Sequence, residues 1–478
     1  MESKNYVGGE WVIPNGRQTV IHNPSNTVEE YGVIHLSTQH DAVEAGEAAK
    51  HAVTGWVNTN TAARGEFLLR AADLLRQRQD EIALTASSEM GKPISEMKGE
   101  VLRGIQLLRY YGAEGVRAIG SVIPASKDNI LQYTRRVPLG IVGIITPWNF
   151  PIAIPIWKLA PALLCGNTIV WKPSEIASLS ATLLMKVFAD AGLPPGVLNL
   201  VVGEGSVVGR ALLDELPLDA VSFTGSTQTG SSIATQAARR NIKYQTEMGG
   251  KNAAVVLRDA NLDLAVSAVI SGAFSSAGQK CTATSRVIVE SAVYDEFVSL
   301  FQHEVRNLYV GSALDPKSYL GPVASASQYD KVAKYVEIAR HEANSIAKAN
   351  IQVDPTSGYY IPPLAVDGIS VEHQLVQEEI FGPLVVFLPV QNFDDALTVC
   401  NKTVYGLSAS VFTENLNNSL RFLDEAHVGM VRVNLETAGV EYQAPFGGMG
   451  LSSSHSREQG QPALDFYSQT KTCAIYYG

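Results

Sequence analysis

Cys281 has the local sequence of a reactive thiol. It lies in Gly-Gln-Lys-Cys-Thr-Ala, where the adjacent lysine and the nearby glycine are typical of an accessible thiolate with a lowered pKa. The alternative is a buried cysteine that packs as a small hydrophobe. This second interpretation is our prediction for Cys165, Cys400 and Cys473, which lie in apolar or strand-like sequence. Cys281 is therefore the candidate nucleophile.

Two further side chains are candidates for chemistry. Glu247 precedes Gly249 and Gly250, and a carboxylate at a strand end that faces a cleft can act as a general base, although a single loop glutamate is more commonly solvated. Asn149 stands in Trp-Asn-Phe-Pro after an apolar run. Its amide could donate to a developing oxyanion, or it could only satisfy a turn before the proline. Each signal is ambiguous by itself.

Two glycine-rich segments could hold a phosphate. Residues 203–209 read G-x-G-x-x-x-G, one residue longer than the dinucleotide fingerprint, so a plain strand-to-helix turn is the favoured interpretation. Residues 225–230 have the G-x-x-x-x-G spacing of a P-loop, but Ser231 stands where the lysine is needed, which disfavours a P-loop NTPase. The backbone N–H groups at the start of the next helix, with Ser226, could still hold a pyrophosphate.

The elements that must position these residues follow an α/β pattern. Residues 40–117 carry apolar residues at helical spacing. From residue 136 onward, short apolar runs alternate with helical patterns of about ten residues, and the alternation restarts after Gly250, which is typical of βαβ units around parallel sheets. No long linker and no repeat separates the two parts. We predict an α/β protein whose domains pack tightly.

Composition and charge exclude several classes of protein. The 37 Lys and Arg against 47 Asp and Glu give a net charge of −10, which argues against a nucleic-acid binder. The most apolar stretch, residues 141–169, contains four prolines and a lysine, so we predict buried core and no membrane span. The first residues lack the apolar region of a signal peptide. The four scattered cysteines form no zinc-ligand spacing, which predicts no metal site and favours the cytoplasm.

Taken together, the motifs resemble the NAD(P)-dependent aldehyde dehydrogenase family. Seven segments follow the order and spacing of that family over essentially the whole chain: PWNFP (147–151), WKPSE (171–175), FTGS (223–226), EMGGKN (247–252), GQKCTA (278–283), EEIFGP (378–383) and PFGG (445–448). The resemblance implies an α/β fold with a Rossmann-type cofactor domain, an α/β catalytic domain and a small β arm that mediates oligomerisation.

The resemblance also implies domain boundaries. The NAD-binding domain would comprise residues 1–117 and 139–249, and the catalytic domain residues 250–449. The oligomerisation arm would comprise residues 118–138 and 450–478. A strand with an exposed edge is a liability in a monomer, so a homodimer or homotetramer is expected.

The resemblance assigns roles to the three candidate residues. Cys281 would attack the aldehyde to give a thiohemiacetal, whose oxyanion Asn149 and the Cys281 backbone N–H would stabilise. Hydride transfer to the nicotinamide would leave a thioester, and Glu247 would activate the water that releases a carboxylic acid.

A cofactor site is implied as well. Its residues would be Thr146, Pro147, Trp148, Lys172, Ser174, Glu175, Gly205, Gly209, Phe223, Gly225, Ser226, Gly249, Glu379 and Phe381. Lys172 and Glu175 would contact the adenosine ribose, and Ser226 with its turn would hold the pyrophosphate. Glu379 would bind the nicotinamide ribose, with Phe381 packing nearby. Because the Glu175 carboxylate can chelate a ribose 2′-hydroxyl and would repel a 2′-phosphate, NAD is favoured and NADP is the alternative.

Within the family, the chain is most similar to the α-ketoglutarate semialdehyde (2,5-dioxopentanoate) dehydrogenase branch. The similar segments are PIAIPIWKLAPAL (151–163), GQKCTATSR (278–286), ETAGVEYQAPFGG (436–448) and SSSHSREQG (452–460). One departure from the family is Gly450, which stands where a lysine often follows the PFGG turn. It lies outside the implied catalytic set and affects only the expected contacts of the C-terminal loop.

A carboxylate-bearing aldehyde needs a cation in the substrate tunnel. Branches that recognise succinate semialdehyde tend to place an arginine where this chain has Trp157, so the cation must come from elsewhere. Arg103 is the best candidate, and an exposed helical arginine with its head in water is an equal alternative. Gln443 and Arg286 are weaker candidates, and Phe446 completes the predicted substrate set.

Three other functions stay open. The first is a broad-specificity aliphatic or aromatic aldehyde dehydrogenase, or a succinate semialdehyde dehydrogenase, in which Arg103 has no role. The second is a Cys-dependent hydrolase or acyltransferase that uses Cys281 and Glu247 without NAD. The third is a non-enzymatic structural protein, which the intact Cys281, Glu247 and Asn149 disfavour.

Overall fold

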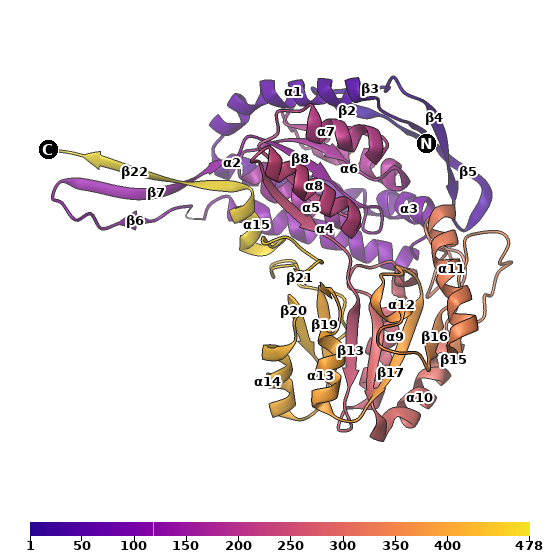
Figure 1. Cartoon of the computed structure of the whole chain (residues 1–478). Coiled ribbons are helices and arrows are strands. Elements are labelled where there is room, and N and C mark those ends of the chain that lie inside the picture. The colour runs from indigo at the N-terminus through magenta and orange to yellow at the C-terminus, as the bar shows by residue number, and fades with distance from the viewer. Residues whose placement is uncertain (118) are drawn as a thin grey trace.

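The computed structural model describes residues 1–117 and 119–478. Residue 118, the first residue of the predicted arm, lies outside the described residues. Figure 1 shows two lobes, each built on a seven-stranded sheet, and a long β arm that projects from the first lobe.

The first sheet contains five parallel strands and an antiparallel edge. Its spatial order is β12 (Lys243–Glu247), β11 (Ala220–Thr224), β8 (Ile141–Ile145), β9 (Thr168–Lys172), β10 (Leu198–Leu200), β2 (Asn5–Val7) and β3 (Glu10–Val12). Strands β12 to β10 are parallel, whereas β2 and β3 pair antiparallel. The chain order reverses between β8 and β11. In open α/β sheets such a reversal marks the crevice in which ligands bind, beyond the carboxyl ends of the strands.

Helices cover both faces of this sheet, which explains its unbroken apolar strands. Ile141 and Ile145 of β8 lie in one core cluster and Val142 and Ile144 in another, because successive side chains point to opposite faces. The helices of the first cluster are α1 (Gln39–Asn58), α7 (Arg210–Asp214) and α8 (Thr227–Arg239). The helices of the other are α2 (Thr61–Gln77), α3 (Gln79–Met90), α4 (Ile94–Glu114), α5 (Ala153–Leu164) and α6 (Ser178–Asp190).

The second sheet forms the core of the other lobe. Its order is β15 (Asn344–Lys348), β16 (Leu364–Asp367), β17 (Leu384–Val390), β14 (Thr284–Glu290), β13 (Asn252–Val256), β19 (Ser408–Phe412) and β20 (Met430–Val433). Only β15 pairs antiparallel in this sheet. Its helices are α9 (Leu262–Phe274), α10 (Tyr294–Arg306), α11 (Ala326–Glu342), α12 (Gln374–Gln377), α13 (Phe393–Asn401) and α14 (Leu416–Glu425).

The arm is a three-stranded antiparallel sheet of β22 (Ser468–Tyr476), β7 (Ile130–Pro138) and β6 (Val122–Ile123). The segment expected to join it from residue 450 onward divides into three parts. Strand β21 (Met449–Gly450) pairs with β18 (Tyr405–Gly406), and α15 (Gly460–Phe466) contacts α5, so only β22 extends into the arm. The apolar side chains of α15 belong to the core of the first lobe, which holds this helix there.

The remaining elements are a small sheet near the N-terminus and four single helical turns. Strands β1 (Glu2–Ser3), β5 (Asn26–His35) and β4 (Gln18–Asn23) form a separate sheet, and single helical turns are η1 (Glu175–Ala177), η2 (Gly205–Gly209), η3 (Ser275–Gly278) and η4 (Ser291–Val293). The helical region expected over residues 40–117 is confirmed as α1 to α4, and the strand–helix alternation is confirmed in both lobes. None of the helices in the described part of the chain is long and apolar enough to cross a membrane.

Candidate active site

The predicted cofactor residues gather beyond the carboxyl ends of the five parallel strands. The end of β8 is followed by Thr146, Pro147 and Trp148, and the end of β9 supplies Lys172, Ser174 and Glu175. The segment after β10 contains Gly205 and Gly209, and the end of β11 supplies Phe223, Gly225 and Ser226. Strand β12 is followed by Gly249. Glu379 and Phe381 come from the second lobe, just before β17. Residues from 146 to 381 therefore meet at the edge where a parallel sheet binds ligands.

A polar rim joins the ends of β9 and β10. The Lys172 Nζ donates to the Pro173 carbonyl at 2.8 Å and lies 3.7 Å from a Glu175 carboxylate oxygen. That same oxygen accepts from the Gly205 N–H at 3.0 Å. Burial lowers the pKa of Lys172, and the nearby Glu175 opposes this effect. The rim presents a cation, a carboxylate and backbone donors close together.

The two glycine-rich segments are both helix starts. Residues Gly205–Gly209 form one π-turn ahead of α7, between β10 and that helix, where the sequence predicts a strand-to-helix turn. Ser226 is the N-cap of α8, and its Oγ accepts from the Thr229 N–H at 3.3 Å. The first turn of α8 thus directs backbone donors toward the end of β11, an arrangement that suits an anion.

Glu379 reaches from the second lobe onto the Gly249–Gly250 turn. The Gly250 N–H donates to its Oε1 at 3.2 Å, and a Cβ at Gly249 would lie 2.2 Å from its Oε2, so only glycine permits this approach. Burial raises the pKa of Glu379. Phe381 adopts a φ of 60° and packs edge-on against Trp148, with 5.6 Å between ring centroids. The junction of the lobes therefore combines a half-buried carboxyl group with an aromatic wall.

Cys281 follows the η3 turn at this junction. Its side chain packs against Leu407, Met430 and Phe446. Burial raises the pKa of the thiol to about 12, and the Glu379 and Glu247 carboxyl groups add to the effect. This value corrects the expectation of a lowered thiol pKa.

The reason lies in where Lys280 points. Its Nζ donates to the Ser271 carbonyl at 3.0 Å and to the Ser275 Oγ at 2.5 Å, near the end of α9. Adjacency in sequence therefore does not bring the ammonium group into a bond with the Cys281 sulfur. The thiol is neutral at rest.

Glu247 is the last residue of β12, and its side chain is buried. Its Oε2 accepts from the Ser453 Oγ at 2.5 Å, whereas its Oε1 has no partner among the described residues. Burial raises its pKa well above the usual range, and the neighbouring Glu458 raises it further. Glu458 itself pairs with the buried Lys158. The carboxyl group is thus held by one oxygen and free at the other.

Asn149 lies in a loop that is tied to the loop of Cys281. Its Nδ2 donates to the Gln279 carbonyl at 3.0 Å, two residues before the thiol. Its own carbonyl accepts from the Lys92 Nζ at 2.6 Å. Lys92 also pairs with Glu100 at 2.6 Å, and both of these charged side chains are buried. Asn149 therefore has a fixed position close to Cys281.

A cavity of about 420 Å³ leads to Cys281. Of the predicted substrate residues, Arg103, Trp157 and Phe446 line it, and the Trp157 and Phe446 rings lie 5.3 Å apart. Its wall also includes residues that the sequence analysis missed, which are Lys92, Glu96, Glu100, Gln106, Phe150, Lys280, Glu436 and Gln459. The spacing of residues 96, 100, 103 and 106 is the signal that could have identified one helix face as a wall.

Arg103 is the predicted substrate cation that the structure places in this cavity. Its Nη2 donates to the Val440 carbonyl and to the Gln459 Oε1 at 3.1 Å, and its guanidinium lies 5.7 Å from the Tyr442 ring centroid. Among residues 1–117 and 119–478, no carboxylate lies within ion-pair distance of it. The group is half-buried and keeps its charge unpaired.

The two weaker candidates lie elsewhere. The guanidinium of Arg286 is buried and donates to the carbonyls of Lys251, Val399 and Cys400 at 2.9, 3.0 and 2.9 Å, so it serves the backbone of the second lobe. Gln443 is exposed and is absent from the cavity wall. Neither side chain is placed to bind a substrate in the Cys281 cavity.

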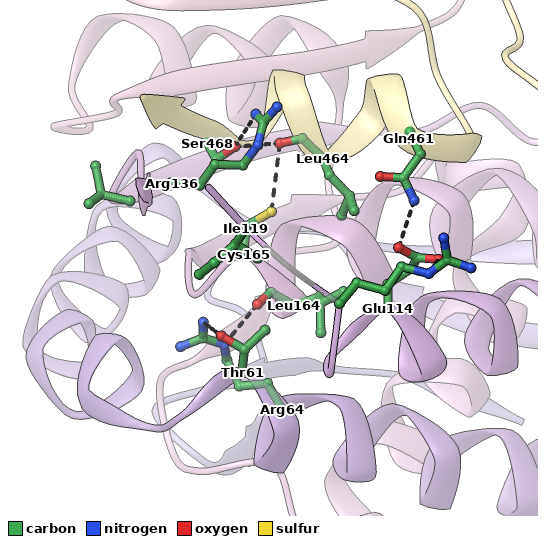
Figure 2. Close-up of a pocket in the computed structure, with 12 residues that line it drawn as sticks. Thr61, Arg64, Glu114, Ile119, Arg136, Leu164, Cys165, Gln461, Leu464 and Ser468 are labelled. Atoms are coloured by element: carbon green, nitrogen blue, oxygen red, sulfur yellow. Dashed lines mark hydrogen bonds and ion pairs between the residues drawn. The ribbon is translucent and has the colours of Figure 1, made fainter. Parts of the chain in front are cut away.

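A second cavity, of about 510 Å³, lies at the base of the arm (Figure 2). Its charged residues are already partnered: Gln461 donates to Glu114 at 2.6 Å, Arg136 to the Ser468 Oγ at 3.1 Å, and Arg64 to the Leu164 carbonyl at 2.8 Å. Burial raises the pKa of its Cys165 to about 12. No predicted site residue lines it, so the candidate active site is the cavity at Cys281.

Known proteins resemble this chain over its whole length. The model of the family described as "Aldehyde dehydrogenase family" matches residues 11–473. The alpha-ketoglutaric semialdehyde dehydrogenase of Bacillus subtilis (strain 168) is 46% identical over 475 residues, covering 98% of this chain and 97% of that protein. The alpha-ketoglutarate semialdehyde dehydrogenase of Haloferax volcanii is 41% identical over 475 residues, covering 98% of each chain.

Solved structures agree with these relatives. The crystal structure of PnpE from Pseudomonas sp. WBC-3, determined in complex with nicotinamide adenine dinucleotide, matches with a TM-score of 0.96 and 33% identity. The match covers 100% of this chain and 98% of PnpE. The two lobes and the arm are thus shared in full with a protein that binds the dinucleotide.

Proposed function

This chain belongs to the aldehyde dehydrogenase family and is an oxidoreductase that acts on aldehydes, and we propose that its substrate is α-ketoglutarate semialdehyde, which it oxidises to 2-oxoglutarate with NAD. Full-length relatives with that activity in their names support the substrate. The observation that carries the proposal is the unpaired guanidinium of Arg103 in the wall of the Cys281 cavity.

The residues at the strand ends fit a nicotinamide dinucleotide. Lys172 and Glu175 would hold the adenosine ribose, and Ser226 with the first turn of α8 would receive the pyrophosphate. Glu379 would bind the nicotinamide ribose, because Gly249 lets its carboxyl group approach the turn beside Cys281. When bound, the nicotinamide accepts a hydride from the carbon of the reacting aldehyde.

The Glu175 carboxylate sets the preference for NAD over NADP in this proposal. It accepts from the Gly205 N–H and keeps a free oxygen for the ribose 2′-hydroxyl. A 2′-phosphate in the same place would meet a negative charge at short range, which disfavours NADP.

Cys281 would act as the nucleophile. After losing its proton, the sulfur attacks the aldehyde carbon and forms a thiohemiacetal. One N–H of the Asn149 amide is already donated to the Gln279 carbonyl, so its second N–H remains for the oxyanion. The fixed position of Asn149 means that this donor requires no rearrangement during the reaction.

Glu247 would act as the base in thioester hydrolysis. Because the Ser453 hydroxyl holds Oε2, the unpartnered Oε1 is the atom that can take a proton from water. The raised pKa disfavours the ionised form and makes it a stronger base when it forms. The water then attacks the acyl carbon, the sulfur leaves and the carboxylic acid is released.

Arg103 would bind the substrate carboxylate at the outer part of the cavity. Trp157 and Phe446 form an apolar wall beside Cys281, which suits the methylene groups of the substrate. A carboxylate that reaches Arg103 gains a charge-assisted hydrogen bond with a group that now has only neutral partners.

We also propose that the protein is a cytoplasmic homodimer or homotetramer that assembles through the arm. The outer part of the arm exposes Leu131, Ile475 and Tyr476, and β22 offers an unpaired edge. The four free cysteines suit a reducing compartment.

The test is NADH formation with 2,5-dioxopentanoate, succinate semialdehyde and benzaldehyde, with a Cys281→Ser protein as the control. We expect the highest kcat/KM with 2,5-dioxopentanoate and no turnover in the control. Equal values for all three aldehydes would instead show a broad-specificity enzyme. Acid formation without NADH would show a hydrolase. A folded protein that forms no product from any of the aldehydes would contradict an enzymatic function.

A further inference from the structure

Helix α4 presents one charged face to the Cys281 cavity. Glu96, Glu100 and Arg103 follow the i, i+4, i+7 spacing of a single helix face, and all three line the cavity. Each contacts a different part of the site: Glu96 the loop before Cys281, Glu100 the loop of Asn149, and Arg103 the loop of Val440. The same rigid element therefore contacts three loops that are far apart in sequence.

Glu96 holds a strained segment in place. Ser276 and Ala277 have φ values of 55° and 53°, in the left-handed region that non-glycine residues rarely adopt. The Glu96 carboxylate accepts from the Ser276 N–H at 2.9 Å and from its Oγ at 2.5 Å. The strained turn ends at Gly278, three residues before the thiol, so this carboxylate fixes the direction from which the chain approaches Cys281.

Glu100 holds the other loop. Its Oε1 accepts from the N–H groups of Ile152 and Ala153, at 2.9 and 3.1 Å, where α5 begins. Its Oε2 pairs with the Lys92 Nζ at 2.6 Å, and the same Nζ donates to the Asn149 carbonyl at 2.6 Å. Because this pair is buried, solvent and salt screen it much less than a surface ion pair.

We propose that α4 sets the spacing between the Cys281 thiol and the Asn149 amide, with Glu96, Glu100 and Lys92 as positioning residues. The two carboxylates are one turn apart, a rise of about 6 Å along the helix. The loops they hold meet in the hydrogen bond from Asn149 to the Gln279 carbonyl. The inference rests on the aldehyde oxidation proposed above, since the spacing matters for a thiol and an amide that act on one carbonyl group.

Two site variants and one matched control test the proposal. Glu96→Ala releases the strained turn. The double variant Lys92→Met/Glu100→Gln removes both buried charges, so that it folds without an unpaired ion, while the glutamine can still accept from the start of α5. The matched control is Glu89→Ala on α3. Like Glu96, Glu89 accepts from the N–H and the Oγ of one serine, here Ser180, at 3.0 and 2.5 Å. Glu89 is buried and lies outside the cavity wall.

The measurements are Tm, kcat, KM for NAD and for the aldehyde, and the rate at which iodoacetamide alkylates Cys281 in the folded protein, followed on the Cys281 peptide. We expect both site variants to lose about 10- to 100-fold in kcat, as misplaced groups do, with KM for NAD unchanged. Glu96→Ala should also change the alkylation rate. Asparagine tolerates left-handed φ, so Ser276→Asn added to Glu96→Ala should restore part of kcat. Glu89→Ala should lower Tm and leave kcat and alkylation unchanged.

Site variants that lower Tm as the control does but keep native kcat would overturn the proposal. Loss of NAD affinity in step with kcat would also overturn it, since the whole site would then have collapsed. If the unsubstituted protein forms no NADH with any aldehyde, the proposed function fails. The alkylation rates of Glu96→Ala and Glu89→Ala then still decide whether Glu96 positions the Cys281 loop.

Discussion

Replacing Arg103 with methionine should separate charged from neutral aldehydes. The substitution keeps much of the volume and removes the guanidinium, whose hydrogen bonds within the protein go to the Val440 carbonyl and the Gln459 amide oxygen. The matched control is Arg109→Met on the same helix, because Arg109 is exposed and pairs with Asp73 at 3.0 Å.

The expected magnitude follows from what the substrate loses. A hydrogen bond to a charged group contributes about 1.5–3 kcal/mol, and Arg103 is half-buried with no competing carboxylate among the described residues. The loss of this contact corresponds to a decrease of about 10- to 150-fold in kcat/KM. Most of it should appear in KM, since the carboxylate is bound equally before and during the chemical step.

The assay uses two aldehydes that differ only in the distal group, 5-oxopentanoate and pentanal. Arg103→Met should lower kcat/KM for 5-oxopentanoate by the factor given above and leave pentanal within about threefold of its original value. Arg109→Met should change neither. Equal losses for both aldehydes in Arg103→Met would refute the reasoning, because the arginine would then hold the Val440 loop and bind no substrate.

Four other residues give testable outcomes. Glu247→Gln should give a burst of one NADH per active site followed by turnover about 10²- to 10⁴-fold slower, because the thioester forms but the base for its hydrolysis is missing. In the native protein kcat should rise with pH, since the raised pKa of Glu247 keeps the base protonated at low pH. Burial raises the pKa of Glu89 from 4.5 to about 7. The stabilisation from protonated Glu89 is therefore complete below pH 4.5 and is lost as the pH rises through about 7. A plot of Tm against pH for Glu89→Gln should lack this decrease. Gly249→Ala places a Cβ 2.2 Å from Glu379 and should raise KM for NAD with a smaller effect on alkylation of the thiol. Glu175→Gln should increase kcat/KM with NADP relative to NAD, and an unchanged ratio would remove Glu175 as the selector.

The strand ends were predictable from sequence, and the contacts between loops were not. Apolar runs with turns after them indicate β8, β9 and β11, and the polar residues that follow must lie at one edge of a parallel sheet. Arg103 and Val440, by contrast, are 337 residues apart, and no local pattern reports their contact. Lys280 shows the opposite error: it is adjacent to Cys281 in sequence, yet its ammonium group bonds to Ser271 and Ser275.

The sequence of α4 indicates that its charges lie on one face. The spacing of residues 96, 100 and 103 places three charges on one face of a helix, and a charged face is usually solvated. In this protein the face is turned inward, because two carboxylates find backbone N–H groups at Ser276, Ile152 and Ala153. The tertiary structure decides which backbone N–H groups of the neighbouring loops need an acceptor. The sequence therefore indicates the charged face of α4 but not the groups that this face binds.

The raised pKa values around the cavity favour entry of the anionic substrate that we propose for this acidic protein. The net charge is −10, and Cys281, Glu247 and Glu379 would together add three negative charges at the catalytic end if all were ionised. Burial favours the neutral form of each, and the Glu379 and Glu247 carboxyl groups further disfavour ionisation of the Cys281 thiol. In the free protein the nucleophile and the base are thus shifted toward their neutral forms, which weakens their repulsion of a carboxylate that approaches the guanidinium of Arg103. Ionisation of the thiol and of Glu247 is needed only after the substrate is bound. The negative charges therefore form after the binding step, in which they would have repelled the substrate.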